Sequence, residues 1–255
     1  MNWEDKIAQR AKELPPSGIR RFFDIVKTMK GAISLGIGEP DFVTPWHIRK
    51  AAITGIERGH TQYTGNSGLI ELRREISAYL KGRFDIEYNP DNELLVTIGA
   101  SEAIDLALRA LLDPGDEVVV PDPSYVSYMP NIYIAGGKAV PVKITAQHEF
   151  RLTPEALKSV ITPRTKALIL PYPNNPTGGI MPRRELEAIA DVIRDTDIVV
   201  ISDEIYAELT YQGTHVSFAS IPGMYERTLV VSGFSKAFAM TGWRLGYAAG
   251  NKDII

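Results

Sequence analysis

Short apolar segments alternate with amphipathic ones along most of this chain, and this alternation constrains the fold more than any other feature. The apolar runs predict strands at 94–99, 116–121, 138–144, 166–171, 197–203 and 228–232. The amphipathic segments predict helices at 101–112 with Ser101 as N-cap, 153–161 with Thr153 as N-cap, and 183–195. Strands this apolar are typical of a mostly parallel sheet with helices on both faces. The sequence therefore predicts an α/β fold.

The composition argues against several classes of function. Of 255 residues, 44% are hydrophobic and 23% are charged, which is enough apolar material for a sizeable core. The net charge of -3 gives no electrostatic reason to expect nucleic acid or a membrane as partner, and no apolar run approaches the roughly 20 residues of a membrane span. The chain has no cysteine, and its four histidines are scattered. We therefore expect a cytoplasmic protein without a metal site.

Small residues follow the first predicted strand, at the kind of edge where open α/β sheets bind ligands. Gly99, Ala100 and Ser101 lead into a helix. Free amides and the helix dipole at such a position favour a phosphate. On its own, however, this pattern is more typical of a plain turn capped by serine.

Other polar and aromatic residues follow later strands at the same predicted edge. Asp203 comes directly after a largely apolar strand, so we expect it to be partly buried and to need a cationic or strongly donating partner. Tyr206 follows closely, and Tyr125 and Asn175 follow other strands. Taken singly, Tyr125 is more typical of packing and Asn175 of a turn.

Lys236 lies just beyond the strand at 228–232. A lysine amine is a nucleophile only when neutral, and burial or a nearby cation lowers its pKa toward that state. Arg244 is a candidate for that cation, or for the partner of a phosphate. Gly233 and Ser235 are expected to leave room for a ligand beside the lysine.

Together these residue types describe a site for pyridoxal 5'-phosphate (PLP). The cofactor needs a lysine for its aldehyde, a carboxylate for its ring nitrogen, hydrogen-bond donors for its phenolic oxygen, an aromatic ring to stack on and a phosphate loop. The sequence offers each of these at the end of a predicted strand. A carboxylate that keeps the ring nitrogen protonated makes the ring an electron sink.

Seven motifs then resemble, in order, those of the class I/II aminotransferases of PLP-dependent fold type I. They are LGIGEPDFVTP (35–45), YTGNSGLIELR (63–73), GASEAID (99–105), DPGDEVVVPDPSY (113–125), NNPTGG (174–179), SDEIY (202–206) and SGFSKAFAMTGWRLGY (232–247). Each motif is weak evidence alone, whereas seven in order are specific.

The resemblance implies a role for each matching residue. Lys236 would form the Schiff base with PLP and carry protons, Asp203 would pair with the ring nitrogen, and Tyr206 would bind the phenolic oxygen. The remaining contacts implied are Asn175 to that oxygen and to the substrate, Tyr125 to the ring, Ala100, Ser101, Ser235 and Arg244 to the phosphate, Tyr63 to the phosphate of a partner subunit, and Gly38 to the substrate. A homodimer with its site at the interface follows from the role of Tyr63.

The resemblance also implies a domain organisation. Residues 1–40 would form an N-terminal arm and part of a small domain, and residues 41–255 the PLP-binding large domain. In the family the chain continues into a C-terminal small domain that carries the arginine for the substrate carboxylate, which would lie beyond Ile255. Two readings are open: a fragment of a longer protein, or a truncated product that binds PLP poorly. The ending GNKDII resembles the start of a helix, so we expect the fragment.

The function implied is transfer of an amino group between an L-amino acid and a 2-oxo acid, with aspartate and aromatic substrates both open. A carbon-sulfur lyase or a cyclopropane-forming synthase is an alternative, because the same site would stabilise the same carbanion. A noncatalytic ligand-sensing regulatory domain is a third, although no basic helix-turn-helix segment precedes residue 30.

Overall fold

A seven-stranded sheet forms the centre of the molecule, in the order β1-β7-β6-β5-β4-β2-β3. The computed structural model describes residues 1–14, 29, 31 and 38–255. The strands are β1 (Leu94–Thr97), β2 (Glu117–Asp122), β3 (Lys138–Lys143), β4 (Thr165–Leu170), β5 (Val199–Asp203), β6 (Thr228–Gly233) and β7 (Gly246–Ala249). Strand β7 runs antiparallel to its neighbours β1 and β6, and the other pairs are parallel. The prediction of a mostly parallel sheet is therefore confirmed.

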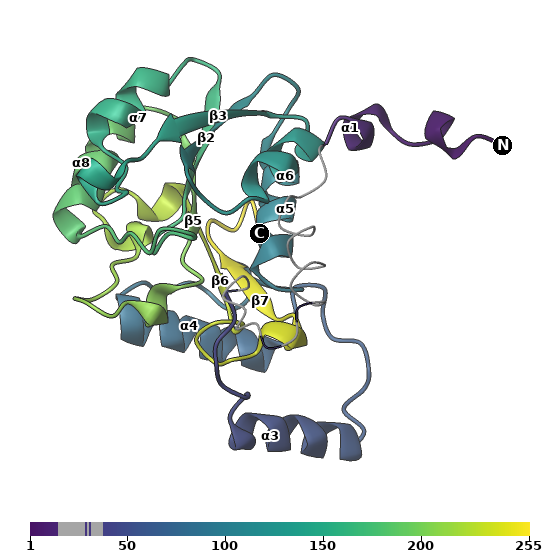
Figure 1. Ribbon diagram of the computed structural model, residues 1–255. Helices are drawn as coiled ribbons and strands as arrows, with labels where there is room; N and C mark the ends of the chain where they lie inside the picture. The colour runs from purple at the N-terminus through teal and green to yellow at the C-terminus, as the bar shows by residue number, and fades with distance from the viewer. Residues whose placement is uncertain (15–28, 30, 32–37) are drawn as a thin grey trace.

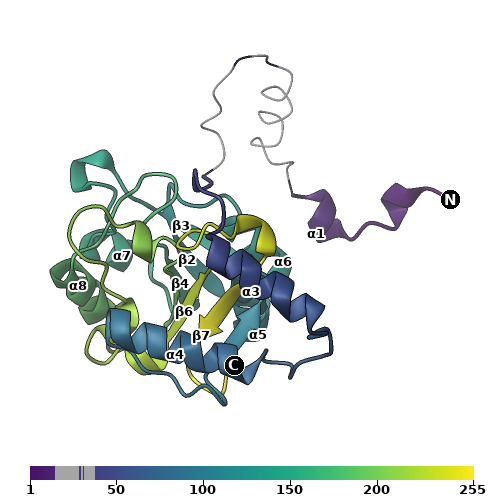
Figure 2. The ribbon, with the colours of Figure 1, turned by 90° about the horizontal axis from the view of Figure 1, so that it is seen from below.

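Helices cover both faces of this sheet, as predicted (Figures 1 and 2). The helices are α1 (Gln9–Lys12), α3 (Trp46–Glu57), α4 (Ile70–Phe84), α5 (Ala100–Leu111), α6 (Tyr128–Ala135), α7 (Pro154–Val160) and α8 (Arg183–Ile193). The pair α5 and α6 lies on one face, while α4, α7 and α8 lie on the other. Helix α3 buries none of its residues and stands apart from the sheet.

The core consists of two apolar layers, one on each face of the sheet. Leu168 and Val200 pack with Ile189 of α8, whereas Ile201 packs with Leu108 of α5 and Ile132 of α6. Successive strand residues point to opposite faces, so Val200 and Ile201 enter different layers. This is why the strands lack polar alternation: both of their faces are covered.

The predicted boundaries agree with the structure to within two residues for every predicted strand and helix. Thr153 caps α7 as predicted, because its side chain accepts a hydrogen bond from the amide of Ala156 at 3.2 Å. The prediction that Ser101 is an N-cap is wrong. Helix α5 begins at Ala100 and its N-cap is Gly99, whose φ of 75° and ψ of 165° suit a residue without a Cβ. Ser101 instead lies in the first turn.

The N-terminal arm is described only in part. Its helix α1 lies beside α6, where Nη1 of Arg10 donates to the carbonyl of Ile134 at 3.3 Å and Tyr133 donates to Glu13. Residues 15–28, 30 and 32–37 of the predicted arm lie outside the described residues. The division into an arm at 1–40 and a large domain at 41–255 stays a prediction. In the part of the chain that the structure describes, no helix has both the length and the apolar character to cross a membrane.

Candidate active site

The residues predicted to form a site come together at the carboxyl edge of the sheet. Strand β5 ends at Asp203, β6 leads through Gly233 to Lys236, and β1 leads through Gly99 into α5. Because parallel neighbours end at the same edge, segments far apart in the chain meet there. The contacts of each side chain show what the edge can hold.

Asp203 is a buried carboxylate that accepts two hydrogen bonds. It is 6% exposed, and it accepts from the Tyr128 hydroxyl at 2.6 Å and the Ile205 amide at 3.2 Å. Burial raises the pKa of Asp203, and the bond from Tyr128 acts against this shift. Within the described residues it forms no ion pair with a lysine or arginine. A cation placed beside it would stabilise its charged form.

Lys236 points back across the site toward the segment that begins at Gly38. Its Nζ donates to the carbonyl of Gly38 and lies 5.5 Å from the centre of the Tyr206 ring. Burial lowers the pKa of Lys236, Glu39 opposes this effect, and Arg244 adds to it. The net shift favours the neutral amine that a nucleophile requires.

Tyr206 and Asn175 form a pair of donors next to the lysine. The Asn175 amide donates to the Tyr206 hydroxyl at 3.5 Å, and burial raises the pKa of Tyr206, with Asp203 adding to the shift. The hydroxyl therefore keeps its proton and can donate to an oxygen. Gly38 borders the same hydroxyl, since a Cβ at Gly38 would lie 3.7 Å from it.

Arg244 lies against Gly99 at the N-terminus of α5. A Cβ on Gly99 would overlap Nη2 of Arg244, so only glycine leaves the guanidinium this place. Arg244 adopts a left-handed conformation with φ of 54°, and its Nη1 donates to the carbonyl of Thr241 at 3.1 Å. The amides of Ala100 and Ser101 belong to the first helical turn, whose N–H groups have no partner within the helix. A guanidinium beside first-turn amides is suited to a phosphate.

For three predicted residues, the structure shows no hydrogen bond or ion pair, among the described residues, to the side chains described above. Tyr125 is 36% exposed, with its ring edge-on to Tyr128 at 5.5 Å, and Ser235 is buried in the loop that carries Lys236. Tyr63 is fully exposed, and no recorded contact among the described residues brings it to the site. Its predicted role belongs to a partner subunit.

The expectation that Gly233 leaves room for a ligand is wrong. A Cβ at Gly233 would lie 2.9 Å from both the Gly246 Cα and the Leu245 carbonyl oxygen. The space beside Gly233 is therefore filled by the backbone of β7, and glycine is needed there for the close approach of two strands.

Sequence reasoning missed Tyr128, the donor to Asp203. Burial raises the pKa of its hydroxyl well above the usual range, so it stays protonated. Its sequence signal is weak: Tyr128 opens an apolar helix shortly after the Asp-Pro-Ser-Tyr turn, which is equally typical of a core residue.

Sequence reasoning also missed a set of bonds that fastens segment 38–44 to the loop after Lys236. Thr241 donates to Glu39, and the Thr44 hydroxyl donates to the carbonyl of Ala239 at 2.5 Å. The Trp243 indole donates to the same hydroxyl at 3.1 Å. These bonds hold the Gly38 carbonyl over Lys236.

Comparison with known proteins gives one consistent family. The model of the family "Aminotransferase class I and II" matches residues 30–255. The putative aminotransferase YugH of Bacillus subtilis is 52% identical over 243 residues, covering 95% of this chain and 63% of the relative. An aspartate aminotransferase of Pyrococcus abyssi is 48% identical over 250 residues, covering 98% of this chain and 64% of the relative.

A solved structure supports the same likeness. The crystal structure of Pyrococcus protein-A1 superposes with a TM-score of 0.94 at 47% identity, covering 96% of this chain and 63% of the other. The chain thus spans less than two thirds of the length of these relatives.

Proposed function

The chain belongs to the class I and II aminotransferases, and from this premise we propose that it carries the catalytic large domain of a PLP-dependent amino-acid aminotransferase. The reaction proposed moves an amino group between an L-amino acid and a 2-oxo acid. The observation that carries the proposal is that the segments carrying Lys236, Asp203 and Arg244 lie at one edge of the sheet, where Arg244 is close enough to act on the charge of Lys236. This edge provides an amine of lowered pKa, a buried carboxylate and a guanidinium beside helix-terminal amides, and PLP uses all three.

The described residues fit PLP on their own chemistry, and members of this family use that cofactor. The buried Asp203 has no cationic partner within the described part of the chain, and a protonated ring nitrogen would supply one. Glycine at position 99 leaves room for the Arg244 guanidinium beside the N-terminus of α5, where it would meet the phosphate together with Ala100 and Ser101. When bound, PLP supplies an electron sink that stabilises a carbanion at the substrate.

The protein's own contribution is orientation and the placement of protons. Asp203 would hold the ring nitrogen protonated, while Tyr128 keeps that carboxylate in place. Tyr206 and Asn175 would donate to the phenolic oxygen. Lys236 would anchor the cofactor covalently, and its released amine would take and return the substrate proton.

Further contacts complete the binding site in this proposal. Tyr125 would stack on the ring, and the buried Ser235 would add a hydroxyl for the phosphate. Gly38 would place its backbone beside the substrate, next to Lys236 and Tyr206. The substrates proposed are amino acids and 2-oxo acids, with aspartate and aromatic side chains both compatible.

A homodimer is part of the proposal. Exposed apolar side chains gather on α3 and the segment before it, with Phe42 82%, Trp46 60% and Ile56 68% exposed. Such a surface is typical of an interface, and Tyr63, on the loop after α3, would reach the phosphate of the second subunit. A role in amino-acid metabolism follows from the proposed substrates, and a cytoplasmic location is part of the same proposal.

The test is an absorbance spectrum of the purified protein with PLP, taken before and after borohydride reduction. Wild type should gain a reduced, lysine-linked cofactor, Lys236→Ala should not, and Lys143→Ala, which removes an exposed lysine of β3, should behave as wild type. Absence of linked cofactor in wild type at saturating PLP would refute the proposal.

Product analysis separates transfer from the alternatives. With an amino acid alone, a transferase releases the 2-oxo acid and leaves the cofactor in its amino form. A carbon-sulfur lyase would release elimination products instead, and a noncatalytic sensor would bind PLP without releasing product. The relatives carry aminotransferase names, which favours the first outcome.

A further inference from the structure

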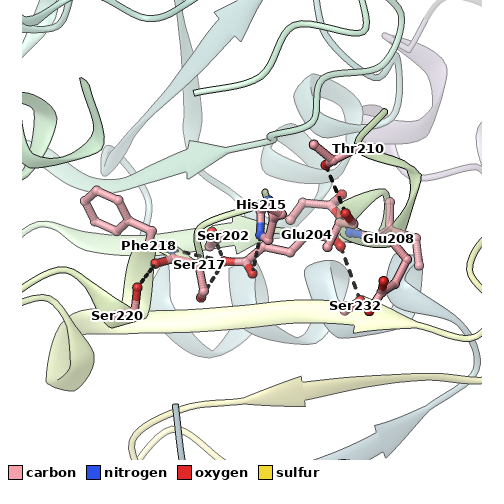
Figure 3. A network of polar contacts seen from close by, with 12 residues as sticks. Ser202, Glu204, Glu208, Thr210, His215, Ser217, Phe218, Ser220 and Ser232 are labelled. Carbon is pink, nitrogen blue, oxygen red and sulfur yellow. Dashed lines mark hydrogen bonds and ion pairs between the residues drawn. The ribbon is translucent and has the colours of Figure 1, made fainter. Parts of the chain in front are cut away.

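A buried polar cluster surrounds Glu204, the residue that directly follows Asp203 (Figure 3). Glu204 is 2% exposed. Its Oε1 accepts from the hydroxyls of Ser202 and Ser217, both at 2.8 Å, and from the amide of Phe218 at 3.2 Å. Its Oε2 lies 2.9 Å from Nε2 of His215. A carboxylate this deep is stable only because its oxygens are satisfied in this way.

The backbone of Glu204 is held as firmly as its side chain. Its amide donates to the carbonyl of Val231 at 2.8 Å, which extends the pairing of β5 with β6. Its carbonyl accepts from the amide of Ala207 at 3.0 Å and from the Ser232 hydroxyl at 3.4 Å. Both backbone groups and the carboxylate of this residue therefore have partners.

Holding Glu204 constrains the residues on either side of it. Asp203 points toward Tyr128 of α6, and Glu204 points to the opposite face, toward Phe218 in the layer that contains α7 and α8. The bond from Ala207 closes the turn that carries Tyr206. Glu204 therefore fixes the backbone between Asp203 and Tyr206, the two proposed cofactor contacts.

We propose that Glu204 is a positioning residue that fixes the Asp203 carboxylate and the Tyr206 hydroxyl in the geometry that binds PLP. The part of this inference that concerns PLP binding rests on the proposed function. The part that concerns the positions of Asp203 and Tyr206 does not. It acts through its neighbours and does not touch the cofactor itself. The cluster is also tied to α4, because His215 packs edge-on against Phe84 with ring centres 5.3 Å apart.

The chain offers a matched control in Glu117, a second buried carboxylate. The Glu117 side chain is 2% exposed, as is that of Glu204. It accepts from Lys138 at 3.0 Å and from the Thr162 hydroxyl at 2.6 Å. It begins β2, however, at the edge of the sheet opposite to the site. Loss of Glu117 would therefore disturb the fold without disturbing Asp203 or Tyr206.

The experiment compares Glu204→Ala, Glu204→Gln and Glu117→Ala in two measurements. The first is amide hydrogen exchange of segment 203–209 in the protein without PLP. The second is the dissociation constant of PLP, followed by its visible absorbance. We expect Glu204→Ala to speed exchange in 203–209 and to weaken PLP binding about tenfold or more, the loss seen when residues that orient metal ligands are removed. Glu117→Ala should do neither, although it lowers the melting temperature.

Glu204→Gln tests the case in which the alanine variant fails to fold. Glutamine keeps an oxygen for Ser202, Ser217 and Phe218 and an amide that can donate to His215, so most of the PLP affinity should be restored. Equal exchange in 203–209 and equal PLP affinity for Glu204→Ala and Glu117→Ala would overturn the inference. If wild type does not bind PLP, the proposed function is refuted. The inference about Glu204 is still tested in that case, because hydrogen exchange in 203–209 reports on the placement of Asp203 and Tyr206.

Discussion

Tyr128→Phe isolates the support of Asp203, because it removes one hydroxyl and keeps the ring. That hydroxyl donates to a carboxylate that is 6% exposed, and among the described residues only the Ile205 amide also donates to it. A hydrogen bond to a charged group contributes about 1.5–3 kcal/mol to stability, and one to a neutral group about 1 kcal/mol. A loss of 2 kcal/mol corresponds to a melting temperature lower by about 4–8 °C in a chain of this size.

The loss should depend on pH, and the sign follows from the shifted pKa. Burial raises the pKa of Asp203 above its ordinary value near 3.8. The stability contributed by this group is therefore present below that value and lost as pH rises through the folded pKa. The bond from Tyr128 favours the charged form, so Tyr128→Phe raises the folded pKa further. The difference between wild type and variant should thus grow with pH, from about 1 kcal/mol toward about 2–3 kcal/mol.

Urea unfolding of the protein without PLP, repeated across a pH series, measures this difference. The control is Tyr172→Phe, which removes another buried hydroxyl whose acceptor, the carbonyl of Phe150 at 3.0 Å, is neutral. Its loss should be about 1 kcal/mol at every pH. If both variants lose the same stability with the same pH dependence, Asp203 does not depend on Tyr128 and the reasoning is refuted.

Three other changes test the packing of the site and of the core. Gly99→Ala should lower stability by about 1–3 kcal/mol through backbone strain, and it should weaken PLP binding by displacing Arg244. The control Gly115→Ala is also strained, at φ of 101°, but has nothing near its Cβ. It should leave PLP affinity unchanged in an absorbance titration. Arg244→Lys should bind PLP more weakly than wild type, because an ammonium replaces a guanidinium that can bind phosphate in a bidentate manner. Equal affinity would count against the proposed phosphate contact. Leu168→Ala, at a fully buried position, should cost about 2–5 kcal/mol in denaturant unfolding, and Leu106→Ala, 41% exposed, should cost no more than about 0.5 kcal/mol.

The sequence by itself determined the class of fold and the edge of the sheet at which the site lies. Runs such as 166–171 and 197–203 are apolar on both faces, which only a sheet covered on both sides accommodates. Local signals also set the start of α7, where Thr153 bonds an amide three residues ahead. These features depend on residues close together in the chain, so a linear pattern contains them.

The tertiary structure alone decided which groups support the site residues. Tyr128 reaches Asp203 from 75 positions away, and Arg244 settles over Gly99 because β7 inserts antiparallel between β1 and β6. The same insertion fills the space beside Gly233 that the sequence had suggested for a ligand. Partners of this kind depend on strand order, register and the face to which each side chain points, which no local pattern records. The sequence therefore predicted the residues of the proposed site, and the fold determined which neighbours set their charge and position.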